Sequence, residues 1–212
     1  MARDGAEVLI LGVGNLLWAD EGFGVRCAEA FAATYATPDG VEVMDGGTQG
    51  LALVNDLAEA KRILIFDAAD FGGEPASLVE AEGDDVPRFV AGKKVSLHQS
   101  SMMEILSLAE LMAGSAPQEI ALIGCQPVEL EDYGGGLTPA VAARVPEALK
   151  AAEALLTRWG FPVTAGQAPL ADPIMPEAVA WKPYEAGRPS AEAAYRKGDD
   201  RVLARILVDG GD

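Results

Sequence analysis

Short apolar runs rich in β-branched residues alternate along the chain with segments whose apolar residues recur at helical spacing. The pattern predicts strands at 7–12, 41–44, 62–66 and 120–124, with further extended pieces at 76–81 and 93–98. Helices are expected from just after Glu21 to about 35, and at 50–60, 100–112 and 138–159. Such alternation is typical of an α/β fold. We therefore predict three αβα layers: a twisted, mostly parallel sheet of about five strands, with helices on both faces.

The chain divides into a regular part and a proline-rich part. Its 212 residues suffice for one substantial core, and we assign residues 1–160 to a single α/β domain. Residues 161–212 form a C-terminal extension in which prolines break regular structure, with a short helix expected only at 201–208. The prolines concerned are Pro162, Pro169, Pro173, Pro176, Pro183 and Pro189.

Charge and composition exclude several classes of partner. A formal net charge of −17 repels phosphate backbones and anionic lipids, so nucleic acid and membrane partners are not expected. No apolar run approaches the roughly 20 residues of a membrane span, and the N-terminus lacks a secretory apolar region. Cys27 and Cys125 are too few for a disulfide framework. These features predict a cytoplasmic protein with reduced thiols.

Three side chains that can bind a metal fall near the ends of predicted strands. Glu21 follows the loop after the first strand, Asp67 follows the strand at 62–66, and His98 precedes the helix at 100–112. In an open parallel sheet, functional groups collect outside the carboxyl ends of the strands. Two carboxylates and one imidazole would suit nickel, zinc, manganese or iron. We therefore take these residues as a candidate metal site.

Each candidate also has an ordinary structural explanation. Glu21 can complement a helix dipole, Asp67 can cap a turn or helix, and His98, the only histidine, can be a polar residue at a helix entry. Asp20 rivals Glu21, but consecutive residues at a helix start point in different directions, so only one is expected to face the crevice. Asp45 and Asp70 are further candidates.

Other chemistries fit less well. The Gly12-Val13-Gly14-Asn15 loop suggests dinucleotide binding, but Leu17 stands where the third glycine of that fingerprint belongs. The sequence contains no phosphate-binding P-loop, zinc-protease helix or serine-hydrolase elbow. A nucleophilic pair of Cys27 and His98 is disfavoured, because Cys27 falls inside a predicted helix, where a cysteine is usually a small buried apolar residue.

Six motifs, in order along about residues 7–160, resemble the hydrogenase maturation endopeptidases. The second and fourth are most similar to members that serve membrane-bound uptake hydrogenases. The motifs are GVGNLLWADEGFGVR (12–26), DGGTQGL (45–51), LIFDAA (64–69), KVSLHQ (94–99), GCQP (124–127) and DYGGGL (132–137).

This resemblance implies a function and a site. Such an enzyme removes the C-terminal peptide of a nickel-loaded [NiFe]-hydrogenase large-subunit precursor. By motif, Glu21, Asp67 and His98 become the nickel ligands and catalytic residues. The nickel would come with the substrate, although other divalent metals would also fit, and a monomer is expected. The proline-rich extension exceeds the compact catalytic unit of the family.

Two other functions remain open at this stage. A nickel-binding assembly chaperone would dock the precursor without cutting it, because metal ligands alone do not establish hydrolysis. A nucleotide- or sugar-binding domain would instead use the loop from Gly12 to Asn15.

Overall fold

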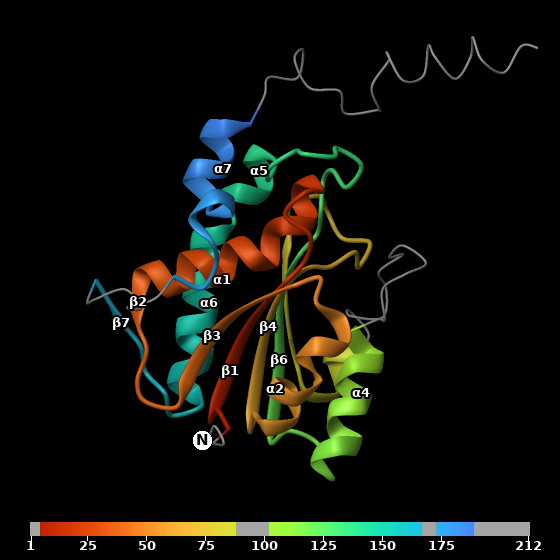
Figure 1. The fold of residues 1–212 in the computed structure, drawn as a ribbon, viewed down its shortest axis with the longest axis vertical. Coiled ribbons are helices and arrows are strands. Elements are labelled where there is room, and N and C mark those ends of the chain that lie inside the picture. Colours follow the sequence, from red (N-terminus) through yellow and green to blue (C-terminus); the bar gives the residue numbers. More distant parts are fainter. Residues whose placement is uncertain (1–4, 88–101, 167–172, 189–212) are drawn as a thin grey trace, which may run out of the picture.

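A five-stranded, mostly parallel sheet forms the centre of the protein, with strand order β3-β1-β4-β6-β5 (Figure 1). The computed structural model describes residues 5–87, 102–166 and 173–188. Only β5 runs antiparallel, along the edge beside β6. The predicted α/β architecture is confirmed. The strands are β1 (Val8–Val13), β3 (Val41–Gly47), β4 (Arg62–Ala68), β5 (Leu78–Glu82) and β6 (Glu119–Cys125).

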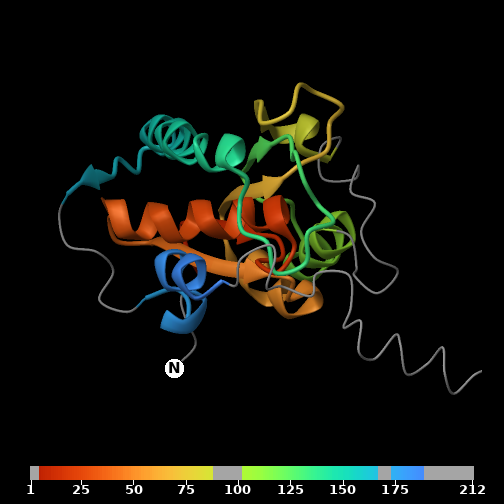
Figure 2. The same cartoon turned by 90° about the horizontal axis from the view of Figure 1, so that it is seen from above.

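Helices cover both faces of this sheet because side chains alternate along each strand. On β1, Val8 and Ile10 join the core beneath α1 (Phe23–Thr34) and α6 (Val145–Arg158). Leu9 and Leu11 instead pack with α2 (Val54–Glu59) and α4 (Met102–Ala113). Figure 2 shows α6 and α4 on opposite sides of the strands. The sheet is therefore buried between two helical layers.

The chain order reverses beside β1. After β1 the chain crosses through α1 to β3 on one side, and after β3 it returns through α2 to β4 on the other side. Connections between parallel strands are right-handed. Because these two connections run in opposite directions along the sheet, α1 and α2 lie on opposite faces. In such folds the ligand-binding crevice lies at this reversal, which here falls between the carboxyl ends of β1 and β4. We refer to this position as the crevice.

Two glycines allow α1 to approach these strand ends closely. A Cβ on Gly24 would lie 2.1 Å from the carbonyl oxygen of Phe66 and 2.3 Å from that of Val13. A Cβ on Gly12 would lie 2.7 Å from the Cβ of Ala28. Only a hydrogen fits in either place, so the start of α1 rests on the backbone of β1 and β4.

The region after β6 differs from the predicted helix at 138–159. The structure contains a short α5 (Pro139–Ala142) and a separate α6 that begins at Val145. Pro146 explains the interruption, because its ring lacks an N–H and clashes with the carbonyl group four residues earlier.

The C-terminal extension also contains more structure than its prolines predicted. β7 (Thr164–Ala165) pairs with β2 (Tyr35–Ala36). A 3-10 turn, η4 (Glu177–Val179), then leads into α7 (Trp181–Gly187). Pro183 lies in the first turn of α7, where a missing N–H costs nothing. The pieces predicted at 93–98 and 201–208 lie outside the described residues.

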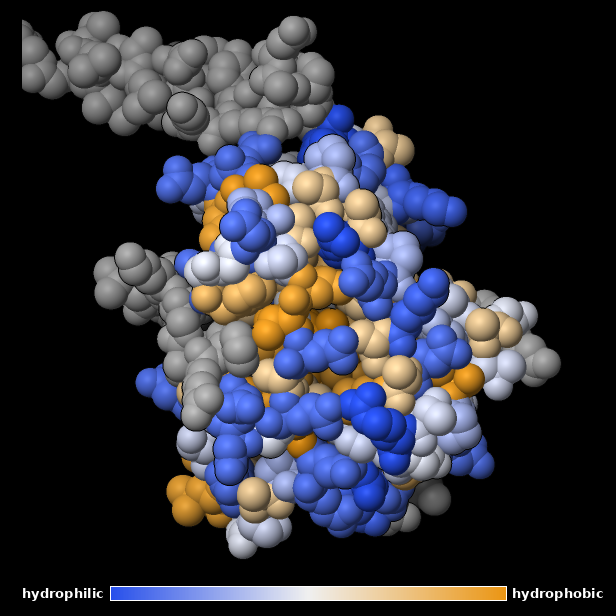
Figure 3. Space-filling view, turned by 180° about the vertical axis from the view of Figure 1, so that it is seen from behind, coloured by the Kyte–Doolittle hydropathy of each residue, from blue (hydrophilic) through white to orange (hydrophobic). Residues whose placement is uncertain are grey.

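Figure 3 shows hydrophilic residues over much of the face opposite to the view of Figure 1, with apolar residues gathered in its middle. Within the described ranges, no helix combines the length and apolar character needed to cross a lipid bilayer.

Gly24→Ala is expected to destabilise the domain by about 2 kcal/mol or more, because the added methyl group would push α1 off the backbone of β1 and β4. Urea denaturation measures this change. Gly187→Ala is the matched control, since nothing lies within 4 Å of its Cβ position. Equal stability of the two variants would contradict the close contact at Gly24.

Candidate active site at the carboxyl end of the sheet

Glu21 and Asp67 lie on the two sides of the crevice between β1 and β4. Glu21 belongs to a single 3-10 turn, η1 (Ala19–Gly22), which contacts β4 and leads into α1. Its carbonyl oxygen would lie 1.8 Å from a Cβ on Gly14, so only glycine is compatible with this contact. Asp67 pairs with Gly124 near the end of β4 and is 3% exposed. Neighbouring elements therefore carry these two predicted site residues to the same end of the sheet.

The third predicted residue, His98, lies outside the described residues. Among the residues that the structure describes, no group of three or more histidine, cysteine or acidic side chains is arranged to hold a metal ion. Glu21 and Asp67 thus supply two acidic side chains of the predicted set, and the imidazole stays a prediction from the sequence.

Asp20, the neighbour of Glu21, has a structural role. Its side chain is fully buried and accepts hydrogen bonds from the backbone N–H groups of Val128 (2.9 Å), Glu129 (2.9 Å) and Thr138 (2.7 Å). The hydroxyl of Thr138 donates a fourth bond at 3.1 Å. Asp20 therefore holds the segment 126–138, named here the rim loop, while Glu21 keeps an accessible side chain beside it.

The residue before Asp20 has an unusual backbone conformation. Ala19 is buried and has a φ of +43°, in the left-handed region that side chains with a Cβ disfavour. A residue held in this conformation costs of order 1 kcal/mol or more, which the surrounding structure has to offset. The four hydrogen bonds between Asp20 and the rim loop stabilise η1 and so help to offset this cost.

Asp45 is a further acid at this end of the sheet, on β3. It lies opposite Gly12 in the β1–β3 register. Its Oδ1 atom is buried and makes no hydrogen bond among the described residues. Burial raises the pKa of its carboxyl group, while the backbone N–H of Gly47 and, to a smaller extent, the positive charge of Arg26 oppose this shift. Asp45 thus joins Glu21 and Asp67 as a candidate for chemistry at the strand ends.

Asp70, by contrast, is engaged in loop packing. Its Oδ1 atom accepts hydrogen bonds from the backbone N–H of Gly72 (3.3 Å) and from Gln126 Nε2 (3.1 Å). The Oε1 atom of Gln126 in turn accepts from the backbone N–H groups of Phe71 and Gly73. Asp70 and Gln126 therefore order the loop after β4, and a sequence alone does not separate this role from a catalytic one.

Neither cysteine has the character of a nucleophile. Cys27 and Cys125 are both fully buried in the core beneath α1 and α6. Burial raises the pKa of Cys27 well above its ordinary value and that of Cys125 to about 12. At neutral pH both thiols stay protonated, whereas the thiolate is the nucleophilic form. The disfavoured pairing of Cys27 with His98 gains no support.

Exposed apolar side chains lie on one side of the crevice, on the rim loop and just before η1. Trp18, just before η1, forms an isolated bridge with Tyr133, and their rings meet edge to face with centroids 5.2 Å apart. The backbone N–H of Glu21 donates to the carbonyl of Trp18 at 2.9 Å, so this surface is joined directly to the site. The exposed residues are Leu17, Trp18, Val128, Leu130 and Tyr133.

The loop after β1 does not support a dinucleotide site. Its backbone folds back at Asn15, whose side chain accepts a hydrogen bond from the N–H of Leu17 at 3.0 Å. Leu17 is 42% exposed, and η1 intervenes before α1 begins. The chain therefore lacks the direct turn from strand to helix that brings a pyrophosphate to a helix N-terminus.

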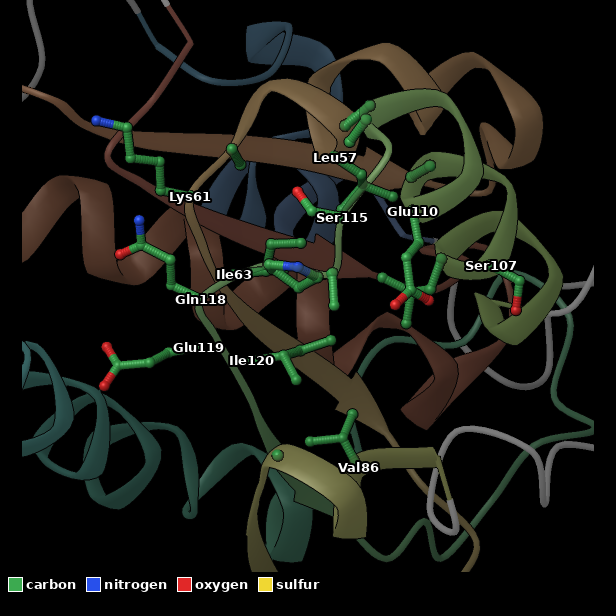
Figure 4. Close-up of a pocket in the computed structure, with 18 of the residues that line it drawn as sticks. Leu57, Lys61, Ile63, Val86, Ser107, Glu110, Ser115, Gln118, Glu119 and Ile120 are labelled. Atoms are coloured by element: carbon green, nitrogen blue, oxygen red, sulfur yellow. The ribbon is translucent and has the colours of Figure 1, made fainter.

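A hollow of about 580 Å³ lies away from these acids, at the opposite end of β4 and β6 (Figure 4). Leu57, Ile63, Val86 and Ile120 contribute apolar walls, and Lys61 and Glu119 lie at the strand starts. The chemistry-bearing groups of the crevice do not reach this hollow.

Comparison with known proteins identifies close relatives. Residues 25–155 match the family model described as hydrogenase maturation protease. The hydrogenase expression/formation protein HupD of Rhodobacter capsulatus is 51% identical over 197 residues, which cover 93% of each chain. The hydrogenase 2 maturation protease of Escherichia coli is 38% identical over 155 residues, or 73% of this chain and 93% of that protein.

A solved structure agrees with these matches. The hydrogenase maturating endopeptidase HybD from E. coli aligns with a TM-score of 0.69 and 36% identity, over 75% of this chain and 97% of its own. The Rhodobacter match is long enough to extend through residues 173–188, whereas the two E. coli matches leave about a quarter of this chain uncovered.

Asp20→Ala is expected to lower the free energy of unfolding by about 3 kcal/mol, because three buried backbone N–H groups would lose their acceptor. Glu21→Gln should change it by less than about 0.5 kcal/mol, since Glu21 is more exposed and the replacement is isosteric. Chemical denaturation of both variants tests whether Asp20 stabilises the fold much more than Glu21 does. Similar losses in the two variants would contradict it.

In the native protein, both thiols should resist a thiol-specific reagent at pH 8, because they are buried and protonated. After unfolding, two equivalents should react at once. Rapid native labelling, lost in Cys27→Ser, would instead establish Cys27 as an accessible thiol.

Proposed function

Because the chain belongs to the hydrogenase maturation protease family, and is by that membership a hydrolase, we propose that it removes the C-terminal peptide of a nickel-loaded [NiFe]-hydrogenase large-subunit precursor. Glu21, Asp67 and His98 contact the nickel of the substrate and act in the cleavage. The observation that supports this proposal is the contact of η1, which contains Glu21, with β4, which contains Asp67, at the point where the chain order reverses.

The donor set fits a metal that arrives with its substrate. Two carboxylates and an imidazole are acceptable ligands for Ni²⁺, which binds oxygen and nitrogen donors. Three protein ligands would leave positions open for water or for groups of the precursor. Such an incomplete site suits recognition of a metal already in place.

Cleavage follows from placing the scissile peptide beside that metal. Binding fixes the orientation of the peptide, which removes much of the entropic cost of reaction. The metal then polarises either the peptide carbonyl or an attacking water molecule. In this scheme Glu21, Asp67 and His98 hold the metal and the peptide together. Asp45, on β3, is a further acid at the same end of the sheet.

The surroundings of the crevice support a protein substrate. Exposed apolar side chains lie beside η1, the turn that contains Glu21. Exposed aromatic and aliphatic groups that cluster at a site are typical of protein interaction surfaces. We place the reaction in the cytoplasm, with the enzyme acting as a monomer on the precursor.

Incubation with matched nickel-loaded and nickel-free precursor tests the function by intact mass. The unmodified protein should release a defined C-terminal peptide from the nickel-loaded precursor only. Asp67→Asn and His98→Ala should each slow this release by about 100-fold or more, because each removes a metal contact.

Asp39→Asn serves as the matched control, since this exposed aspartate lies in the turn before β3, at the other end of the sheet. It should process the precursor at the normal rate. Binding of the nickel-loaded precursor without any loss of mass would overturn the protease assignment and favour an assembly chaperone. Equal cleavage of nickel-free precursor would overturn the role of the metal.

A further inference from the structure

A segment of the C-terminal extension, residues 173–188, is anchored on α1 by a buried cation. We name this segment the strap. Arg26 is only 3% exposed, and its Nη1 atom donates to the carbonyl oxygen of Val179 at 2.7 Å. The same guanidinium lies 5.3 Å from the ring centre of Tyr184. A buried arginine that binds carbonyl and aromatic groups is well satisfied, so the strap is held at a specific place.

A second anchor acts next to the first. The carboxylate of Glu29 pairs with Arg26 at 2.9 Å and accepts a hydrogen bond from the backbone N–H of Trp181 at 2.7 Å. Trp181 also packs against the core beneath α1. Figure 1 places α7 at the end of the molecule where β1 and β4 terminate. The strap therefore lies at the same end as the candidate site.

The far end of the strap meets the rim loop. A Cβ on Gly136 would lie 1.7 Å from Glu185 Oε1 and 3.0 Å from Arg188 Nη1. Glu185 and Arg188 also pair with each other at 3.4 Å. Because Gly136 has no side chain, this ion pair packs directly against the backbone of the rim loop.

The rim loop is thus held from two sides. Asp20 binds Val128, Glu129 and Thr138 from within, and the strap covers Gly136 from outside. Between these contacts lie the exposed side chains of Val128, Leu130 and Tyr133. Any change in the strap would alter the orientation of the surface beside Glu21.

We propose that the strap is a positioning element, which holds the rim loop so that residues 128–133 receive the large-subunit precursor and contribute to choosing it. Glu185 is the positioning residue at the contact. This inference rests on the proposed function. It assigns to the extension the recognition of substrate, while Glu21, Asp67 and His98 keep the chemistry.

Comparison with the family favours a role for the strap in substrate recognition over a role in the general stability of the fold. The match to the family model ends at residue 155, and an E. coli relative with 93% of its length matched leaves about a quarter of this chain uncovered. The strap thus lies outside the part of the chain that matches the family model. Ordering the strap on Arg26 and Trp181 costs conformational entropy, which favours a function for this segment.

The first experiment uses the full chain and loosens the strap by Trp181→Ala with Tyr184→Ala. Lys182→Ala, an exposed position on the same helix, is the control. For nickel-loaded precursor, KM should rise about tenfold while kcat stays within about twofold, because recognition weakens and the chemistry is intact. Backbone amides of residues 128–136 should exchange hydrogen faster. Unchanged KM and unchanged exchange would overturn the proposal.

The second experiment tests the contact itself. Gly136→Ala should displace Glu185 and raise KM, and Glu185→Ala, which removes the same contact, should raise KM to a similar extent, with little further rise when the two changes are combined. An unchanged KM in both single variants would also overturn the proposal. If the unmodified protein cut no precursor, the proposed function would fail, whereas the exchange measurement would still report whether the strap orders the rim loop.

Discussion

The reversal of chain order beside β1 is the constraint on which the rest of this structure depends. Right-handed crossovers in opposite directions place α1 and α2 on opposite faces, and this leaves the carboxyl ends of β1 and β4 uncovered between them. Gly12 and Gly24 then let α1 start against the backbone of both strands. The topology therefore brings the elements that contain Glu21 and Asp67 to the same edge of the sheet.

At this edge, two neighbouring residues have separate roles, one in the fold and one in the proposed chemistry. Asp20 uses its buried carboxylate for four hydrogen bonds to the rim loop, whereas the side chain of Glu21 is only partly buried. The same division recurs at longer range, since Arg26 and Glu29 of α1 anchor the strap. One short stretch of sequence therefore shapes the site, its rim and the packing of the extension.

The strand pattern and the strand-end acids could be read from the sequence, because buried parallel strands are continuous apolar runs and their ends are marked by polar residues. The roles of Asp20 and Glu21 could not, since their directions depend on a 3-10 turn and on partners more than 100 positions away. The single helix predicted at 138–159 missed the break between α5 and α6, although a proline inside a helical pattern, here Pro146, is a local signal for such a break. The packing of α7 carried no local signal, because its anchors Arg26 and Glu29 are about 150 positions distant. His98 stays a prediction.

X-ray absorption at the nickel edge tests the central claim most directly. The nickel-loaded precursor would be measured alone and then saturated with the His98→Ala variant, which retains both carboxylates and is expected to bind without cutting. The account predicts that binding adds oxygen ligands to the nickel, and that Asp67→Asn in the same variant reduces this change. A nickel environment identical in the bound and unbound precursor would contradict the account.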